Sequence, residues 1–193
     1  MNKNFRILIV LFVEVLIVVL LVVIPQRMAA SQKENTPPET YVYHNVYFEY
    51  PGDWDVTLNE TADSGELTVK PSPGSPEAKM FGTFYIMFLP DLALENWEQT
   101  LATDSTCSGR TNTLWYSIVD NGDFSGFECV WKLPEEEYPY WEFFLYNESD
   151  QMAFSILANP LNDAAAKALN SVETAESTFP DIIHIAESVR IQE

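Results

Sequence analysis

The chain is poor in the residues that carry most catalytic and metal-binding chemistry. It has two histidines, His44 and His184, and two cysteines among 193 residues. Neither histidine lies in a motif and no Gly-x-Ser-x-Gly sequence is present, so the sequence offers no activated nucleophile of the kind a hydrolase requires. A zinc site needs about four Cys or His ligands in spaced pairs, which are also missing. We therefore expect no catalytic residues and a protein that is not an enzyme.

Glycine and basic residues are also scarce. The seven glycines form no Gly-rich loop of the kind that holds a nucleotide phosphate. Ten basic residues stand against 29 acidic residues, which gives a formal net charge of −19. Such a surface repels phosphate backbones and anionic lipid head groups, whereas cations and basic partners are attracted. We expect no binding to nucleic acid and no cofactor.

One long apolar segment lies near the N-terminus. Residues Ile7 to Ile24 are all Ile, Leu, Val or Phe except Glu14, and Pro25 follows them. Eighteen residues of helix rise about 27 Å, close to the hydrocarbon thickness of about 30 Å. Lys3 and Arg6 precede the segment, which places the N-terminus in the cytoplasm by the positive-inside rule. The sequence therefore predicts one transmembrane helix over residues 7–24, with the rest of the chain outside the cell membrane.

A cleaved signal peptide is the alternative interpretation of this segment. Ala29-Ala30-Ser31 offers a cleavage site of small residues, although the apolar run exceeds the usual length of about 7 to 15 residues. Under both interpretations the remaining chain is extracytoplasmic, and it is secreted if the segment is cleaved. Within the segment, Glu14 is either a contact to another membrane helix or a tolerated, protonated side chain.

Composition divides the rest of the chain into a linker and one domain. Residues Met28 to Thr40 include two prolines and mostly small or polar residues, which is typical of a flexible linker. Residues 41–193 suffice for one domain with a sizeable core. The predicted organisation is residues 1–27 as anchor or signal sequence, 28–40 as linker and 41–193 as extracytoplasmic domain.

Hydrophobic patterning in the domain predicts antiparallel strands and two helices. Strands are predicted at Tyr41–Tyr50 (one or two strands), Glu66–Lys70, Gly82–Leu89, Tyr140–Tyr146 and Gln151–Leu157. Gly82–Leu89 is apolar on both faces, which predicts a central strand covered on both sides. One helix is predicted from Asp91, with Leu94, Trp97 and Leu101 buried, and one from Asp163 to Phe179, ended by Pro180, with a short turn and an extended segment after it. This order predicts an α+β fold with an antiparallel sheet covered by helices.

A further hairpin is predicted around Asn121-Gly122, the preferred pair for a two-residue turn. The register of this turn pairs residues that share an apolar face: Leu114 with Cys129, Tyr116 with Phe127, and Ile118 with Ser125. Cys107 and Cys129 are the candidate disulfide, since such bonds persist outside the cytoplasm. Because Cys129 faces Leu114 in this register, the bond requires a bend before Leu114, and otherwise Cys129 is a buried thiol.

Two groups of residues are candidates for ligand binding. Oxygen ligands suitable for calcium are offered by Asp53, Asp55, Asp120 and Asp123, although tight turns favour Asp in any case. The segment Pro134–Trp141 offers aromatic rings to a sugar or a peptide, although aromatic residues at strand spacing are more often core. A calcium- or carbohydrate-binding surface module is therefore the alternative function.

The segment Asn45–Val56 (NVYFEYPGDWDV) resembles the opening of PsbP-like domains, the family named for an extrinsic subunit of photosystem II. The hairpin residues Gly126-Phe127 and the ending Ala186–Ile191 (AESVRI) are similar in their order to the later segments of that family. The resemblance implies an α/β/α sandwich around an antiparallel sheet, acting as a binding or accessory module without catalysis. None of the photosystem subunit's metal-binding residues aligns here. With the anchor, we expect a tethered domain that contacts an unknown protein or small ligand at the cell surface.

Overall fold

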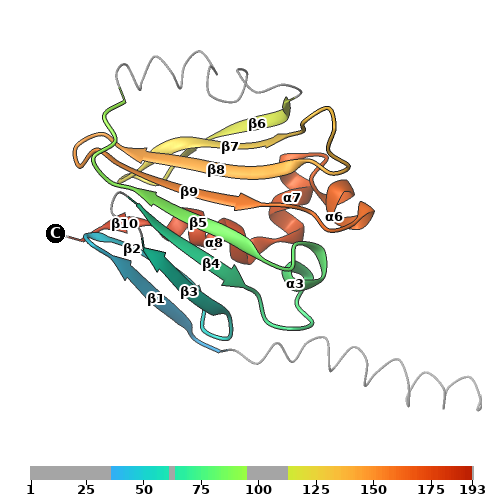
Figure 1. The fold of residues 1–193 in the computed structure, drawn as a ribbon, viewed down its shortest axis with the longest axis horizontal. Helices are drawn as coiled ribbons and strands as arrows, with labels where there is room; N and C mark the ends of the chain where they lie inside the picture. Colours follow the sequence, from blue (N-terminus) through green and yellow to red (C-terminus); the bar gives the residue numbers. More distant parts are fainter. Residues whose placement is uncertain (1–35, 61–63, 95–112, 193) are drawn as a thin grey trace, which may run out of the picture. The chain divides into compact units, whose positions relative to one another are not determined.

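Strands dominate the part of the chain that the computed structural model describes, which is residues 36–60, 64–94 and 113–192 (Figure 1). The chain divides into two units, residues 1–37 and 38–193, and all the strands and helices described below belong to the second unit. The predicted transmembrane segment lies outside the described residues. Within the described ranges, no helix has the length and apolar character needed to cross a membrane.

The larger sheet has seven strands, and every neighbouring pair is antiparallel. In spatial order the strands are β3 (Asp55–Glu60), β4 (Gly65–Lys70), β5 (Phe84–Leu89), β9 (Met152–Ala158), β8 (Tyr140–Asn147), β7 (Ser125–Trp131) and β6 (Thr113–Asp120). The strands from β6 to β9 form consecutive hairpins, and the last of them returns to pair with β5. The predicted hairpin of β8 and β9 is confirmed.

The smaller sheet contains β1 (Pro38–Tyr43), β2 (Val46–Pro51) and β10 (Arg190–Ile191). The aromatic segment predicted as one or two strands is therefore a hairpin, and β1 begins three residues earlier than expected. Tyr50 and Glu39 are register partners in this hairpin, and the Tyr50 hydroxyl donates to Glu39 Oε2 at 2.8 Å, which joins the start of β1 to the end of β2. Burial, followed by the hydrogen bond and charge of Glu39, raises the pKa of Tyr50 to about 12.

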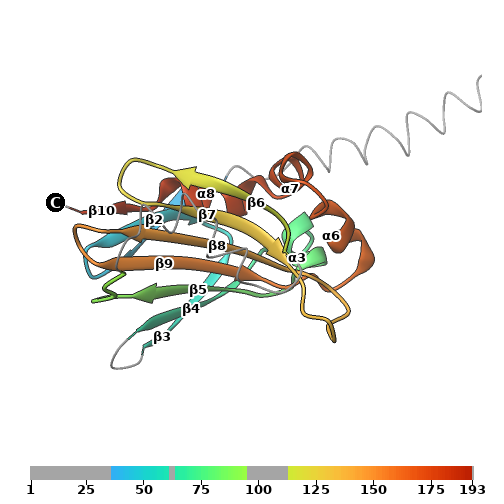
Figure 2. The same cartoon turned by 90° about the horizontal axis from the view of Figure 1, so that it is seen from above.

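The main core lies between one face of the larger sheet and the layer formed by the smaller sheet and α8 (Pro180–Ser188) (Figures 1 and 2). Phe48 of β2 reaches the larger sheet, where its ring centroid lies 5.6 Å from that of Phe154 and 6.2 Å from that of Phe88. Ile182 and Ile185 of α8 are fully buried in the same cluster. The smaller sheet thus buries one face and leaves the other toward solvent.

The second predicted helix is wrong in its extent. Residues 163–179 form two short helices, α6 (Asp163–Ala168) and α7 (Val172–Thr178), because Ser171 caps a new helix by accepting from Thr174 N at 3.3 Å. Pro180 does not end helical structure but begins α8, at a position where its missing N–H needs no partner. A further short helix, α3 (Pro76–Met80), was not predicted.

The predicted helix start at Asp91 is also wrong. Asp91 has a φ of 55°, and residues 91–94 are not helical. Leu92 instead lies along the β8–β9 hairpin: its N–H donates to Gln151 O at 2.8 Å, and its carbonyl accepts from the Tyr146 hydroxyl at 2.7 Å. Trp97 and Leu101 lie outside the described residues. The preceding strand β5 is central as predicted, but its second face is covered only in part, since Tyr85 is 40% exposed whereas Leu89 packs against a second buried cluster.

The register predicted for the β6–β7 hairpin is wrong by two residues. Asp120 pairs with Ser125 and Tyr116 with Cys129, so the turn contains four residues and not two. Phe124 is the cause: its side chain is buried, and its N–H donates to Asn121 Oδ1 at 2.9 Å. A shift of two residues keeps each side chain on its predicted face. On that face three residues of β6 are exposed: Leu114 (53%), Tyr116 (43%) and Ile118 (53%).

These strands and helices confirm the predicted α+β class with mainly antiparallel sheet. The short helices lie at the ends of strands or against the core face, and most of the buried side chains come from strands.

Candidate functional site

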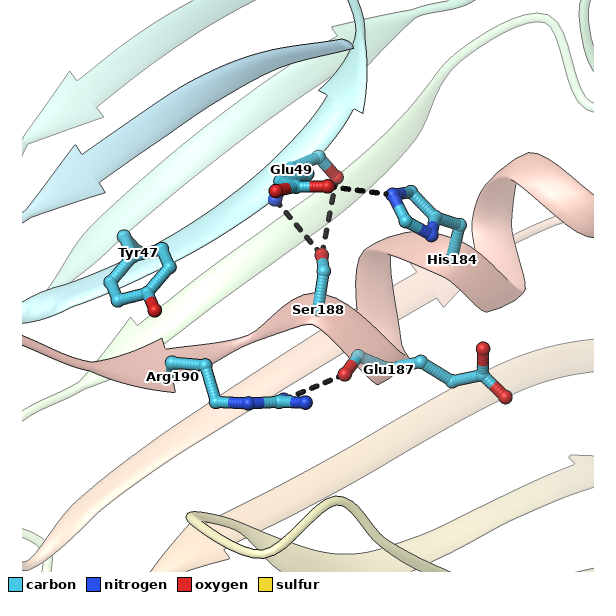
Figure 3. Close-up of a pocket in the computed structure, with 6 residues that line it drawn as sticks. All are labelled: Tyr47, Glu49, His184, Glu187, Ser188 and Arg190. Carbon is cyan, nitrogen blue, oxygen red and sulfur yellow. Dashed lines mark hydrogen bonds and ion pairs between the residues drawn. The ribbon is translucent and has the colours of Figure 1, made fainter.

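Two adjoining hollows lie on the solvent face of the three-stranded sheet. The first has a volume of about 430 Å³ and is lined by Tyr47, Glu49, His184, Glu187, Ser188 and Arg190 (Figure 3). The second has a volume of about 500 Å³ and is lined by Thr40, Val42, Tyr47, Ile191 and Gln192. Tyr47 belongs to both. We refer to the two hollows together as the sheet-face site.

Strand alternation and the end of α8 position these side chains. In β2 the residues Val46, Phe48 and Tyr50 are buried, so Tyr47 and Glu49 point to the opposite, solvent-facing side. Arg190 of β10 is the register partner of Tyr47. The last turns of α8 contribute His184, Glu187 and Ser188, which lie beside Glu49 and Arg190 in Figure 3.

Glu49 and His184 form a partly exposed hydrogen-bonded pair, which is an ion pair when His184 is protonated. His184 Nε2 lies 3.1 Å from Glu49 Oε2, and the two side chains are 48% and 44% exposed. An exposed pair of this kind adds little to stability, about 0 to 1 kcal/mol, because solvent screens it. The pair therefore orients two polar groups at the site without being needed for the fold.

Ser188 stands close to this pair but is engaged by the backbone. Its Oγ accepts from Glu49 N at 2.9 Å and donates toward Ile185 O at 3.1 Å. Among the described residues no hydrogen bond joins Ser188 to His184. The carboxylate, imidazole and hydroxyl of a hydrolytic triad are thus present by type, but the imidazole faces the carboxylate alone and the hydroxyl serves as a backbone clamp.

Arg190 supplies the cationic group of the site. Its Nη1 donates to Glu187 O at 2.6 Å and to Val189 O at 2.7 Å, which fixes the guanidinium beside α8. Within the described ranges, no hydrogen bond engages Nε or Nη2 of Arg190, the Tyr47 hydroxyl or the Glu187 carboxylate. The site therefore keeps both donors and acceptors available to a ligand.

The β6–β7 turn holds the backbone that carries Arg190. Asn121 Nδ2 donates to Ala186 O and to Val189 O, both at 3.1 Å. Asp123 Oδ2 accepts from Ile191 N at 3.0 Å. The turn thus bonds to the chain on both sides of Arg190 and connects the larger sheet to the site.

The calcium candidates are not brought together as a ligand set. Asp120 Oδ1 accepts from Gly122 N at 2.9 Å, so this carboxylate and that of Asp123 are both engaged by backbone amides. Asp53 and Asp55 lie at the start of β3, and Asp53 contributes its backbone carbonyl to Ser72 Oγ. Across the described part of the chain, no group of three or more His, Cys, Asp or Glu side chains is arranged to hold a metal ion.

The predicted aromatic surface at Pro134–Trp141 is wrong for Trp141, which is fully buried. Its Nε1 donates to Glu128 Oε1 at 2.8 Å inside the core. Burial raises the pKa of Glu128 to about 7, although the hydrogen bond from Trp141 opposes the shift. On the opposite face of the same strands, Trp131 Nε1 donates to Glu142 Oε2 at 2.9 Å. Both indoles therefore join neighbouring strands.

The two histidines lie in different surroundings, and only one of the two cysteines is among the described residues. His44 lies in the β1–β2 turn with its ring 4.4 Å from that of Tyr43, whereas only His184 lines the sheet-face site. Cys129 is fully buried and is not a free thiol. Cys107 lies outside the described residues, so the Cys107–Cys129 bond stays a prediction.

Sequence reasoning missed this site as a unit. The outward pointing of Tyr47 and Glu49 was readable from the alternation of β2. Their partner His184 is 135 residues from Glu49 in sequence, and no motif connects the two.

Comparison with known proteins adds little to this geometry. No family model matches the chain, and no curated protein matches it. Among solved structures, a protein from Bacteroides thetaiotaomicron aligns with 13% identity and a TM-score of 0.45. The alignment covers 80% of this chain and 48% of that one, so the chain spans about half the length of this structural match.

Proposed function

We propose that this protein is a non-catalytic, extracytoplasmic binding or accessory domain that contacts a protein or small ligand through the sheet-face site. One observation carries the proposal: the site keeps Tyr47, Glu187 and most of Arg190 unengaged by the described residues, while Ser188 is held by the backbone. Available donors and acceptors beside an engaged hydroxyl favour holding a ligand over attacking it.

The tether and the family form part of the same proposal. The apolar residues 7–24 favour a single membrane anchor, or a signal peptide if they are cleaved, and both interpretations place the site outside the cytoplasm. The resemblance of Asn45–Val56 to PsbP-like domains favours an α/β/α sandwich, with which the α+β class is compatible. The predicted Cys107–Cys129 bond would suit such a compartment.

Site-specific photo-crosslinking of the full chain in its native membrane tests the proposal. A photoreactive residue in place of Val42, which is 52% exposed and lines the second hollow, should capture a reproducible neighbour. The matched control replaces Leu161, which is 58% exposed and lies outside the site. Capture of the same neighbours from both positions would contradict a specific contact through this face, and no capture from Val42 would contradict a protein ligand there.

A further inference from the structure

We propose that the sheet-face site binds a neutral saccharide of at least two sugar units, with the Tyr47 ring as the stacking platform. This inference rests on the proposed binding function and names its ligand class.

The charges at the site argue against an ionic ligand. The first hollow is lined by one arginine, Arg190, and by two acidic residues, Glu49 and Glu187, and His184 is already directed at Glu49. An anion would meet these carboxylates and the repulsion of a chain with net charge −19. A cation would meet Arg190 in the same hollow. A neutral ligand avoids both penalties.

The hydrogen-bonding groups suit a ligand that both donates and accepts. A carboxylate only accepts and a guanidinium only donates. Arg190, Glu49 and Glu187 line the same hollow, so donor and acceptor side chains are both present there. A sugar hydroxyl can donate to a carboxylate and accept from a guanidinium. Two neighbouring hydroxyls can bond to the two oxygens of one carboxylate or to two N–H groups of one guanidinium.

The aromatic ring and the room around it set the size of the ligand. Tyr47 lies between the two hollows and is partly exposed, so its ring can pack against the C–H face of a sugar. The second hollow adds polar Thr40 and Gln192 and apolar Val42. Hollows of about 430 and 500 Å³ on either side of one ring each fall within the range of about 300 to 1,000 Å³ typical of small-molecule pockets. The ligand therefore extends over both sides of Tyr47.

Calorimetric titration of the full chain tests the inference, in a detergent whose head group is not a sugar. The probes are cellohexaose, maltohexaose, xylohexaose and chitohexaose, with hexagalacturonate as the anionic comparison. We expect saturable binding of at least one neutral probe and none of hexagalacturonate. Tyr47→Ala should weaken binding about tenfold, whereas Tyr47→Phe, which keeps the ring, should retain it. Tyr116→Ala is the matched control, since Tyr116 is an exposed tyrosine on β6 away from the site.

The inference is overturned if no neutral probe binds, or if Tyr47→Ala and Tyr116→Ala weaken binding equally. The outcomes of the two experiments distinguish this inference from the proposed function. Capture of a protein from Val42 without any saccharide binding would support the proposed binding role and contradict the saccharide inference. Saccharide binding that depends on Tyr47, with no protein captured, would support the inference and identify the ligand as the saccharide.

Discussion

The solvent face of the smaller sheet differs from the larger sheet in how its polar side chains are used. In the seven-stranded sheet Glu128 and Glu142 are buried, and each accepts a hydrogen bond from a tryptophan indole. In the three-stranded sheet Tyr47 and Arg190 stand at the solvent face with groups that no described residue engages. The comparison teaches that the buried carboxylates of the larger sheet join strands, whereas the solvent face of the smaller sheet keeps polar groups available. Function is therefore better sought on the smaller sheet.

The largest effect is expected from Trp141→Ala in the larger sheet. Trp141 is fully buried between Phe81, Phe143 and Phe179, with ring centroids 5.2 to 5.9 Å away. Its removal should lower the free energy of unfolding by about 3 to 5 kcal/mol, through the cavity left behind. Tyr47→Ala in the smaller sheet is the control and should change it by less than about 0.5 kcal/mol. Urea unfolding of both variants measures the difference, and similar losses would contradict the contrast between the sheets.

The next effect is a pH dependence carried by Glu128. Its folded-state pKa of about 7 lies above the ordinary 4.5, so the folded protein holds a proton that the unfolded chain releases as the pH rises from 4.5 to 7. The free energy of unfolding should therefore fall by up to about 3 kcal/mol across this window. In Glu128→Gln, which cannot ionise and can still accept from Trp141, this fall should disappear. Thermal or urea unfolding at pH 4 and pH 8 measures it.

The comparison with wild type decides that prediction. Relative to their difference at pH 4, the Gln variant should gain stability over wild type at pH 8. Parallel stability curves for the two proteins would show that Glu128 does not titrate in this window.

A smaller effect is expected where the two sheets are joined. Asn121→Ala removes two hydrogen bonds to the carbonyls of Ala186 and Val189 and two acceptor contacts within the turn. The loss should be about 1 to 3 kcal/mol, because buried acceptors lose their partner. Asn59→Ala is matched to it, since Asn59 is exposed and, among the described residues, its amide donates to Thr68 Oγ1 alone. Equal losses in chemical unfolding would argue against the turn as a connection between the sheets.

The smallest effect is expected at the exposed pair of Glu49 and His184. A double-mutant cycle with Glu49→Gln and His184→Ala should give a coupling below about 1 kcal/mol, decreasing with added salt. A coupling of about 2 kcal/mol or more would show that the pair stabilises the fold. In that case Glu49 and His184 would belong with the polar groups that stabilise the fold and not with those available to a ligand.

Local pattern predicted most of the fold because the strands bury alternate residues. Trp141, Phe143 and Leu145 recur at the strand period and are all buried in β8. The predicted helix boundaries were wrong where two signals compete. Pro180 is compatible with both the end and the start of a helix, and in the structure it begins α8. The cap at Ser171 begins α7, which separates this helix from α6.

The hairpin turn and the site depended on distant contacts. Asn121-Gly122 favours a two-residue turn, but burial of Phe124 and the bonds from Asn121 to the end of α8 stabilise a longer one. No local pattern contains this information. The same is true of Glu49 and His184, which only the packing of α8 beside β2 brings together.

The bonds from the β6–β7 turn to both sides of Arg190 have a consequence for how the site can be observed. Any shift of the backbone at Val189 or Ile191 on ligand uptake must alter the bonds to Asn121 and Asp123. The amide resonances of this turn would then change although no ligand touches it. If the site binds a ligand as proposed, the hairpin would report its occupancy by NMR from a neighbouring sheet.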